Sequence, residues 1–192
     1  MKVNRPYNMK ARAAAAEATR LRVLNVVSAL LKTRFRSEIR LEDVAAGAAV
    51  TVQTVLNLFG NRAALLKEGL ESLLRELRAQ RLSATPGDVA GAISVLMDHY
   101  EQFGDLVIRN LAERADPQLI KVGRLGHRRW VQRQFAYTLE RADAARRRVL
   151  TDALVSACDV YTWKLLRRDM GRSRLDVEAT ILKMVKSIAG ET

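Results

Sequence analysis

Apolar side chains recur along this chain at helical spacing, in blocks separated by short polar turns. In the first block Leu24, Val27 and Leu31 stand at positions i, i+3 and i+7, the spacing of one face of an amphipathic helix. Later blocks repeat this spacing, and no stretch alternates as a strand would. The pattern predicts helices over residues 13–33, 41–48, 52–59, 62–82, 89–103, 106–114, 117–140, 143–171 and 173–189. Aromatic residues make up only 5% of the chain, which also disfavours a sheet. We therefore predict an all-α fold of about nine helices.

Turn and capping residues mark several of these boundaries. Gly60-Asn61 is expected to stop one helix and cap the next, and Asp116-Pro117 forms an N-cap followed by proline at the first helical position. Ser173 and Asp176 have the spacing of a capping box. The first ten residues are polar and basic and predict a flexible arm.

The stretch Ser-Ala-Thr-Pro-Gly-Asp at 83–88 is the best boundary in the chain. The balance of charge changes there, because residues 1–82 hold 15 Lys and Arg against 7 Asp and Glu, whereas residues 83–192 hold 18 against 14. The basic excess therefore lies mainly in the first half, as expected if that half meets a polyanion. We predict a head over 1–60, a connecting helix over 61–82 and a body over 83–192.

Residues 41–59, LEDVAAGAAVTVQTVLNLF, have the layout of a helix-turn-helix. Ala45 supplies a small residue where the second helix packs, and Thr51 is a favoured N-cap for that helix. Val55 and Phe59 are spaced to point inward. Gln53 and Asn57 then share the outer face, where their amides suit bidentate contact with adenine. The pattern fits an ordinary helical hairpin with a solvated face equally well.

The same segment resembles the tetracycline-repressor (TetR) family of bacterial regulators, whose signature is close to T-x-x-x-I-A-x-x-A-G-V-S-x-x-T-x-Y-x-H-F, followed by a residue pair and K-x-x-L. The matching residues are Val44, Ala45, Ala48, Val50, Thr51, Thr54, Phe59 and Leu65, with Arg62 in place of the lysine. The resemblance covers about residues 20–70 in sequence and the whole chain in layout. It implies a three-helix DNA-binding head and a helical body for ligand binding and dimerisation.

Four departures from the signature affect the expected contacts. Arg40 replaces the threonine that opens the first motif helix, which would exchange a hydroxyl–phosphate contact for a charged one. Ala49 replaces the turn glycine, at a cost of roughly 1–2 kcal/mol if it is left-handed, so we expect the turn to be reshaped around Gly47. Leu56 replaces the tyrosine that usually reaches a phosphate, and Leu58 replaces the usual histidine. Leu56 is therefore limited to sugar or thymine-methyl contact.

On this basis the sequence predicts a set of DNA contacts. Its members are Arg40, Thr51, Val52, Gln53, Thr54, Leu56, Asn57 and Arg62. Arg40 and Arg62 begin helices, where backbone amides favour phosphate. Lys10 and Arg12 are candidates for an arm that reaches a groove.

Two further sets are predicted in the body. A ligand pocket is expected among Met97, Tyr100, Phe103, Trp130 and Gln134, although aromatic residues at helical spacing are more often plain core. Stripes on the last two long helices are expected to pair across a two-fold axis, or else to pack within the monomer. They comprise Leu150, Leu154, Ala157, Tyr161, Leu165, Val177, Ile181, Val185 and Ile188.

Other functional classes have little support in the sequence. His99 and His127 are the only histidines, too few for an evident metal site, and no glycine-rich phosphate loop or nucleophile–base pair indicates an enzyme. A single cysteine, Cys158, fits a reducing cytosol, so we expect a cytoplasmic protein without cofactor or membrane partner. We predict a homodimeric regulator, most simply a repressor that a small-molecule effector releases from its operator DNA. The alternative is a helical-bundle interaction or structural protein.

Overall fold

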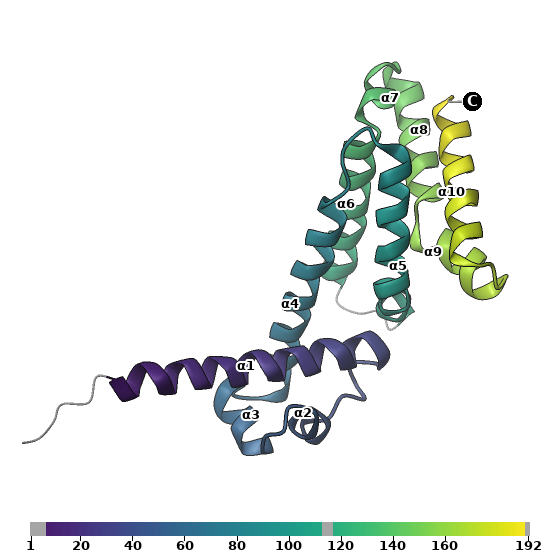
Figure 1. The fold of residues 1–192 in the computed structure, drawn as a ribbon. Helices are drawn as coiled ribbons and strands as arrows, with labels where there is room; N and C mark the ends of the chain where they lie inside the picture. Colours follow the sequence, from purple (N-terminus) through teal and green to yellow (C-terminus); the bar gives the residue numbers. More distant parts are fainter. Residues whose placement is uncertain (1–6, 113–116, 191–192) are drawn as a thin grey trace, which may run out of the picture. The chain divides into compact units, whose positions relative to one another are not determined.

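The computed structural model describes residues 7–112 and 117–190, and every regular element in these ranges is helical (Figure 1). The all-α prediction is confirmed. The chain divides into two compact units, Met1–Arg75 and Glu76–Thr192. The first contains α1 (Tyr7–Thr33), α2 (Leu41–Gly47), α3 (Val52–Phe59) and most of α4 (Arg62–Leu82), whose last seven residues belong to the second.

The remaining elements all belong to the second unit. They are α5 (Val89–Ala112), α6 (Pro117–Gln134), α7 (Ala136–Glu140), α8 (Ala144–Ala157), α9 (Val160–Lys164), the π-helical turn η1 (Leu165–Asp169) and α10 (Arg174–Ala189).

The first unit is built around the apolar face of α1. That face supplies Val23, Leu24, Val27 and Leu31, as the spacing predicts. Helix α4 packs closely on it at Gly69, where an added Cβ would lie 2.3 Å from Cγ1 of Val27. Because any larger residue would force the two helices apart, Gly69 sets their separation.

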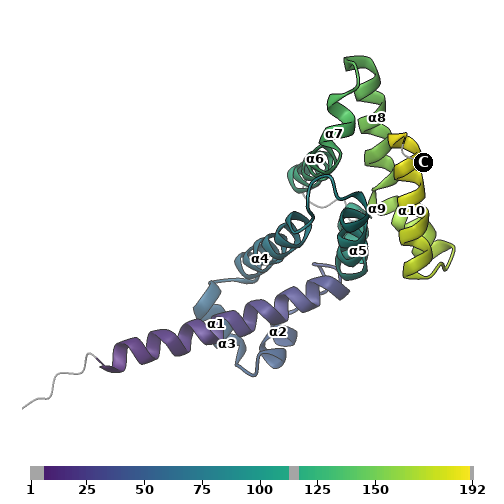
Figure 2. The same cartoon turned by 45° about the horizontal axis from the view of Figure 1, so that its top comes forward.

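The second unit has its core along α5. Helix α5 lies beside α9 and α10 (Figure 2), and its buried residues include Leu96, Met97 and Phe103. Trp163 of α9 is fully buried against Gly104, where an added Cβ would lie 2.4 Å from the ring atom Cζ3. The indole therefore occupies the space that a side chain at position 104 would need.

Ion pairs hold the polar edge of α5 to the end of the chain. Three arginines that follow α9 pair with three acids of α5: Arg167 Nε with Glu101 Oε1 at 2.9 Å, Arg168 Nη2 with Asp105 Oδ2 at 3.0 Å, and Arg174 Nη2 with Asp98 Oδ1 at 2.5 Å. These side chains are partly exposed, so each pair adds little stability alone. Together the three pairs join α5 to the segment from η1 to the start of α10.

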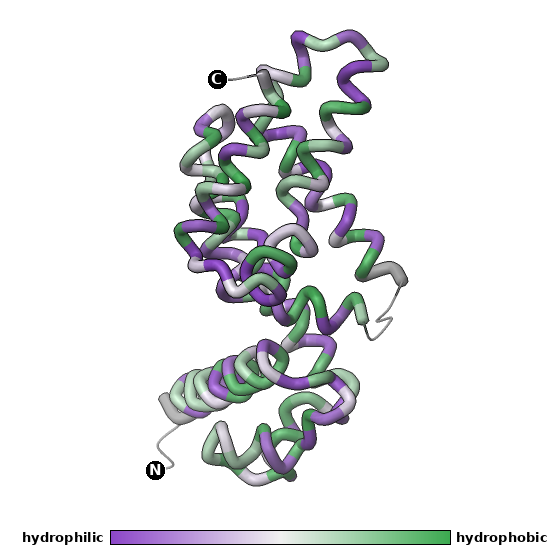
Figure 3. Tube along the Cα trace, turned by 90° about the vertical axis from the view of Figure 1, so that its right-hand side faces the viewer, coloured by the Kyte–Doolittle hydropathy of each residue, from purple (hydrophilic) through white to green (hydrophobic). Residues whose placement is uncertain are grey.

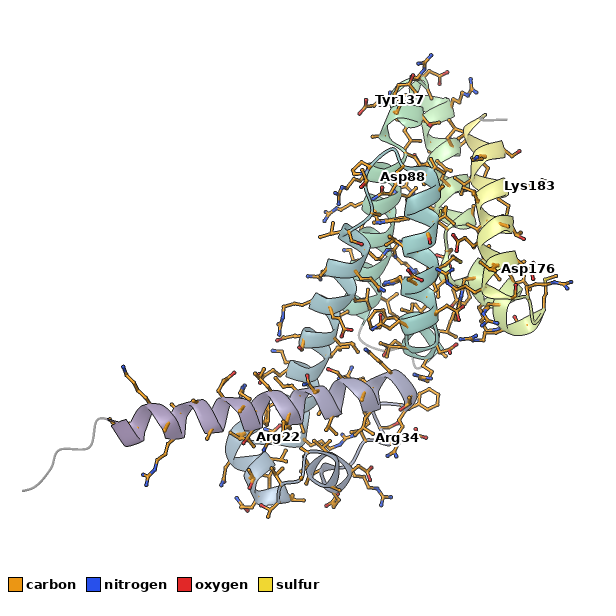
Figure 4. All side chains as sticks on the ribbon, viewed as in Figure 1. Arg22, Arg34, Asp88, Tyr137, Asp176 and Lys183 are labelled. Atoms are coloured by element: carbon orange, nitrogen blue, oxygen red, sulfur yellow. The ribbon has the colours of Figure 1, made fainter. Side chains whose placement is uncertain are left out.

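Local capping explains where several helices begin. The Asp88 side chain accepts the Gly91 amide at 2.9 Å at the start of α5, and the predicted capping box of Ser173 and Asp176 opens α10; Asp88 and Asp176 are labelled in Figure 4. At Gly60-Asn61, the Asn61 side chain accepts the Ala64 amide at 2.9 Å, as predicted.

Four predicted boundaries are wrong. Helix α1 begins at Tyr7 rather than near residue 13, because its first turns are rich in alanine, a strong helix former. Helix α5 continues to Ala112, so no separate helix begins at 106. The predicted helix from 117 to 140 is interrupted at Phe135. The predicted helix from 143 to 171 ends at Ala157, since the Asp159 side chain accepts the Tyr161 amide and starts α9. The N-cap assigned to Asp116 and residues 1–6 of the predicted arm lie outside the described residues.

Helix α6 has two different halves. Residues 121–126 are all exposed, and Gly123 and Gly126 have open space where a Cβ would be. From residue 127 the helix turns a face inward, and Trp130, Val131 and Gln134 are buried.

The hydropathy view shows apolar and polar residues alternating around most helices (Figure 3). Within 7–112 and 117–190, none of the helices is long and apolar enough to cross a membrane.

Candidate nucleic-acid interface

The turn between α2 and α3 is a Schellman motif. The Val50 amide donates to the Ala45 carbonyl at 3.0 Å, and the Ala49 amide donates to the Ala46 carbonyl at 3.2 Å, the two bonds that define this helix end. Ala49 has φ +55°, and Gly47 remains within helix α2. The expected reshaping around Gly47 is therefore wrong. Alanine occupies the left-handed position itself, because both hydrogen bonds of the motif require it there.

Thr51 directly follows this turn and is the N-cap residue of helix α3. The Thr51 hydroxyl accepts the Thr54 amide at 3.1 Å, as an N-cap does, and lies 2.9 Å from the Thr54 hydroxyl. The Val55 and Phe59 side chains are buried, which anchors one face of α3 in the first unit. The cap and the two buried residues fix which face of α3 points outward.

The outward face of α3 presents two amides side by side. Gln53 and Asn57 are exposed, and Gln53 Nε2 donates to Asn57 Oδ1 at 2.9 Å. Each amide has an acceptor and two donors, so the pair keeps further hydrogen-bonding groups for a base edge. Val52 and Leu56 flank the pair and are half-buried. This arrangement can read a donor–acceptor pattern in a major groove.

Arg20 of α1 holds the far end of α3, a role that the sequence did not reveal. Its Nη1 donates to the Leu58 carbonyl at 2.8 Å, its guanidinium carbon lies 4.5 Å from the Phe59 ring centroid, and its Nη2 forms an ion pair with Glu68 of α4. One side chain thus joins α1, α3 and α4. No local signal in the sequence points to this contact, because residues 20 and 59 are far apart in the chain and only the fold brings them together.

Arg62 ties the start of α4 to the loop between α1 and α2. Its Nε donates to the Ile39 carbonyl at 2.8 Å, and its Nη2 donates to the Arg36 and Ser37 carbonyls. These bonds assign the residue a structural part in the head. The predicted phosphate contact of Arg62 is not tested by them and stays a prediction.

Arg40 is placed differently from Arg62. It occupies the N-cap position of α2 with an extended backbone, its side chain forms no capping hydrogen bond, and it is exposed. Nearby, Arg34 pairs with Asp43 at 2.9 Å (Arg34 is labelled in Figure 4).

Lys10 and Arg12 are exposed on the first turns of α1. The arm predicted for them is therefore helical from Tyr7 onward.

The residues predicted to line a ligand pocket all lie in the second unit and are buried. Met97, Tyr100, Phe103, Trp130 and Gln134 have at most 5% of their surface exposed. Tyr100 donates its hydroxyl to the Cys158 carbonyl at 2.7 Å, and Trp130 Nε1 donates to the Arg81 carbonyl at 3.0 Å. Burial raises the pKa of the Cys158 thiol to about 12, which makes it unreactive.

The predicted dimer residues separate into two groups. Five of them belong to the core of the monomer: Leu154, Ala157, Val177, Ile181 and Val185. Their side chains pack within the second unit, and their predicted contact with a second copy stays a prediction. Leu150 and Ile188 are half-buried against that core, and Tyr161 and Leu165 are exposed.

The described residues also bear on metal binding. Among 7–112 and 117–190, no three His, Cys, Asp or Glu side chains gather where they could hold a metal ion. His99 and His127 lie close to Arg81 instead, within the second unit.

Comparisons with known proteins agree with this architecture. Neither a protein-family model nor a curated protein matches the sequence. Among solved structures, a TetR-family transcriptional regulator from Streptomyces coelicolor is similar with a TM-score of 0.69 and 15% sequence identity, over 90% of this chain and 80% of that one. At this identity the likeness concerns the fold. The chain therefore has the fold of a TetR-family transcriptional regulator.

Proposed function

We propose that this protein is a sequence-specific DNA-binding regulator that acts as a homodimer and represses transcription until an effector releases it. The observation that carries the proposal is the outward pair of Gln53 and Asn57 on a capped, anchored helix that follows a tight turn. Shared fold with a transcriptional regulator supports it. The excess of basic residues in 1–82 adds attraction to the phosphate backbone.

Base reading is tested at Gln53. Selection on random duplex DNA identifies a preferred site, and a gel-shift titration then compares the wild type with Gln53→Ala. We expect a loss of roughly 1–3 kcal/mol on that site and relaxed preference at one base pair. Asn25→Ala, which removes an exposed amide from α1, is the matched control and should bind as the wild type does.

Phosphate contact is tested at Arg40, because its side chain makes no capping bond. Arg40→Ala should weaken binding to all sequences alike and lower the slope of log affinity against log salt by about 0.9.

Equal losses on selected and random DNA for Gln53→Ala would contradict the assigned reading face. A wild-type protein that binds neither kind of duplex at low salt would favour the alternative, a helical interaction protein.

For the dimer we propose a seam on the outward sides of α8 and α10. These sides carry exposed or half-buried apolar and small residues: Val149, Ala153, Leu175 and Ala179. Leu175 has 73% of its surface exposed and Val149 64%, and a dimer that covered them would bury apolar surface. Small residues between them allow close helix approach. Two copies related by a two-fold axis would suit a two-fold operator.

A further inference from the structure

Arg81, in the last turn of α4, places a guanidinium among neutral side chains of the second unit. Its carbon lies 4.5 Å from the ring centroid of Trp130 and 6.0 Å from that of Tyr100. Its Nη2 lies 3.0 Å from Nδ1 of His127. Contact of this kind with aromatic faces and an imidazole holds the guanidinium in place without neutralising its charge.

Both histidines beside Arg81 are neutral near pH 7. His127 Nε2 donates to the Val155 carbonyl at 3.1 Å, so its Nδ1 is the acceptor for Arg81. Burial and the charge of Arg81 lower the pKa of His127 to about 4. The same two causes lower the pKa of His99, whose Nδ1 lies 3.3 Å from Gln80 Oε1. The histidines therefore leave the charge of Arg81 uncompensated.

One acid, Asp159 at the N-cap of α9, acts on this cluster without forming an ion pair with Arg81. Asp159 influences the pKa of His127 and Tyr100, but its carboxylate accepts the Tyr161 amide at 2.9 Å as the N-cap of α9. In the described part of the chain, no ion pair joins Arg81 to a carboxylate. A partly buried cation without an ion-pair partner is unfavourable, so a negative charge placed close to Arg81 would be stabilised there.

Two polar atoms in the same region lack hydrogen bonds. Within the described residues, Nε of Arg81 and Oε1 of Gln134 are buried without a partner. Gln134 has 1% of its surface exposed and follows Trp130 by one helical turn on α6. Buried polar atoms are normally paired. An unpartnered donor beside a cation, and an unpartnered acceptor one turn along, indicate a position that a ligand completes.

We propose that Arg81 binds the carboxylate of an organic anion, with Gln134 Oε1 accepting from a donor group. A planar guanidinium matches a carboxylate through paired hydrogen bonds. A single cation among neutral residues balances one negative charge, which favours a carboxylate over a phosphate dianion. The inference rests on the proposed function, since the anion would be the effector. Because Arg81 lies on α4, which the two units share, binding there acts directly on that helix.

The test uses the full-length protein and calorimetric titration with four carboxylates: benzoate, phenylacetate, octanoate and decanoate. Each is paired with its primary amide, which keeps the shape and removes the charge. We expect at least one carboxylate to bind the wild type about tenfold or more tighter than its amide. The preference should disappear in Arg81→Gln and persist in Arg78→Gln, the exposed arginine one turn earlier on α4.

Equal affinity for each carboxylate and its amide in the wild type would overturn the proposal, as would a preference that survives Arg81→Gln. If Arg81→Gln fails to fold, Arg81→Lys keeps the charge and loses the planar fork. It should retain the preference for carboxylate over amide with weaker binding, and unchanged affinity would count against paired recognition.

Gel shifts on the selected duplex separate the two proposals. Binding of DNA without carboxylate preference refutes the anion site alone, and carboxylate binding through Arg81 without DNA binding refutes the regulator alone.

Discussion

Replacing Ala49 with glycine should stabilise the DNA-binding head. Ala49 is the C′ residue of the Schellman turn with φ +55°, where a side chain is strained. Because the residue is exposed, the change removes no buried packing. The effect therefore depends on the backbone alone.

The magnitude follows from two opposing contributions. Relief of the left-handed strain contributes roughly 1–2 kcal/mol, and the greater freedom of glycine in the unfolded chain costs about 0.4–1 kcal/mol. We expect a net increase of about 0.5–1 kcal/mol in the free energy of unfolding of the first unit. Ala46→Gly, at an exposed position inside α2, should instead lower it by about 0.8–1 kcal/mol.

Native-state hydrogen exchange followed by mass spectrometry can assign the effect to the head. Amides of α2 and α3 should exchange about 2- to 5-fold more slowly in Ala49→Gly, while peptides from α5 and α10 should not change. Tryptophan fluorescence cannot replace this assay, because both tryptophans, Trp130 and Trp163, lie in the second unit. Destabilisation by Ala49→Gly of the same size as by Ala46→Gly would show that the left-handed conformation is not the native one.

Three more results are expected. His127 should make stability fall by about 1 kcal/mol per pH unit as pH drops from about 6.5 toward its folded pKa of about 4, because the unfolded chain binds the proton first. Denaturation at several pH values checks this, and His127→Gln should reduce the slope and leave the part that His99 contributes. Gly104→Ala should destabilise the body by about 1–3 kcal/mol through overlap with Trp163, whereas Gly123→Ala, in open space on α6, should stabilise it slightly. Unfolding followed by tryptophan fluorescence measures both changes, since both tryptophans lie in the body. Leu175→Glu should give monomers in sedimentation velocity, whereas Leu125→Glu, an exposed change on α6, should not; a dimeric Leu175→Glu protein would place the seam elsewhere.

Local sequence signals were sufficient for much of the head. The spacing of Val55 and Phe59, the N-cap Thr51 and the outward amides could be predicted because each depends on neighbours within one or two turns. The left-handed Ala49 could not, since propensity alone argues against alanine there. The Schellman hydrogen bonds and the packing of α3 override that preference.

Predictions for the body needed long-range information. An apolar stripe identifies a buried face but does not say what buries it. The sequence therefore favoured a dimer contact for Leu154 and Ile181, although both side chains belong to the core of the second unit. Arg81 escaped notice for a related reason. On α4 it resembles any exposed helix arginine, and its partners lie 19 to 49 residues away in sequence.

The uneven construction of α6 has a consequence for proteolysis. With no buried side chain over residues 121–126 and two glycines among them, little opposes local opening of these turns, so the peptide bonds after Lys121 and Arg124 should be among the first that trypsin cuts in the native protein. The second half of the same helix holds His127 and Trp130 against Arg81. A molecule that tightens this contact would slow the cleavage, and limited digestion would thus report its binding without any label.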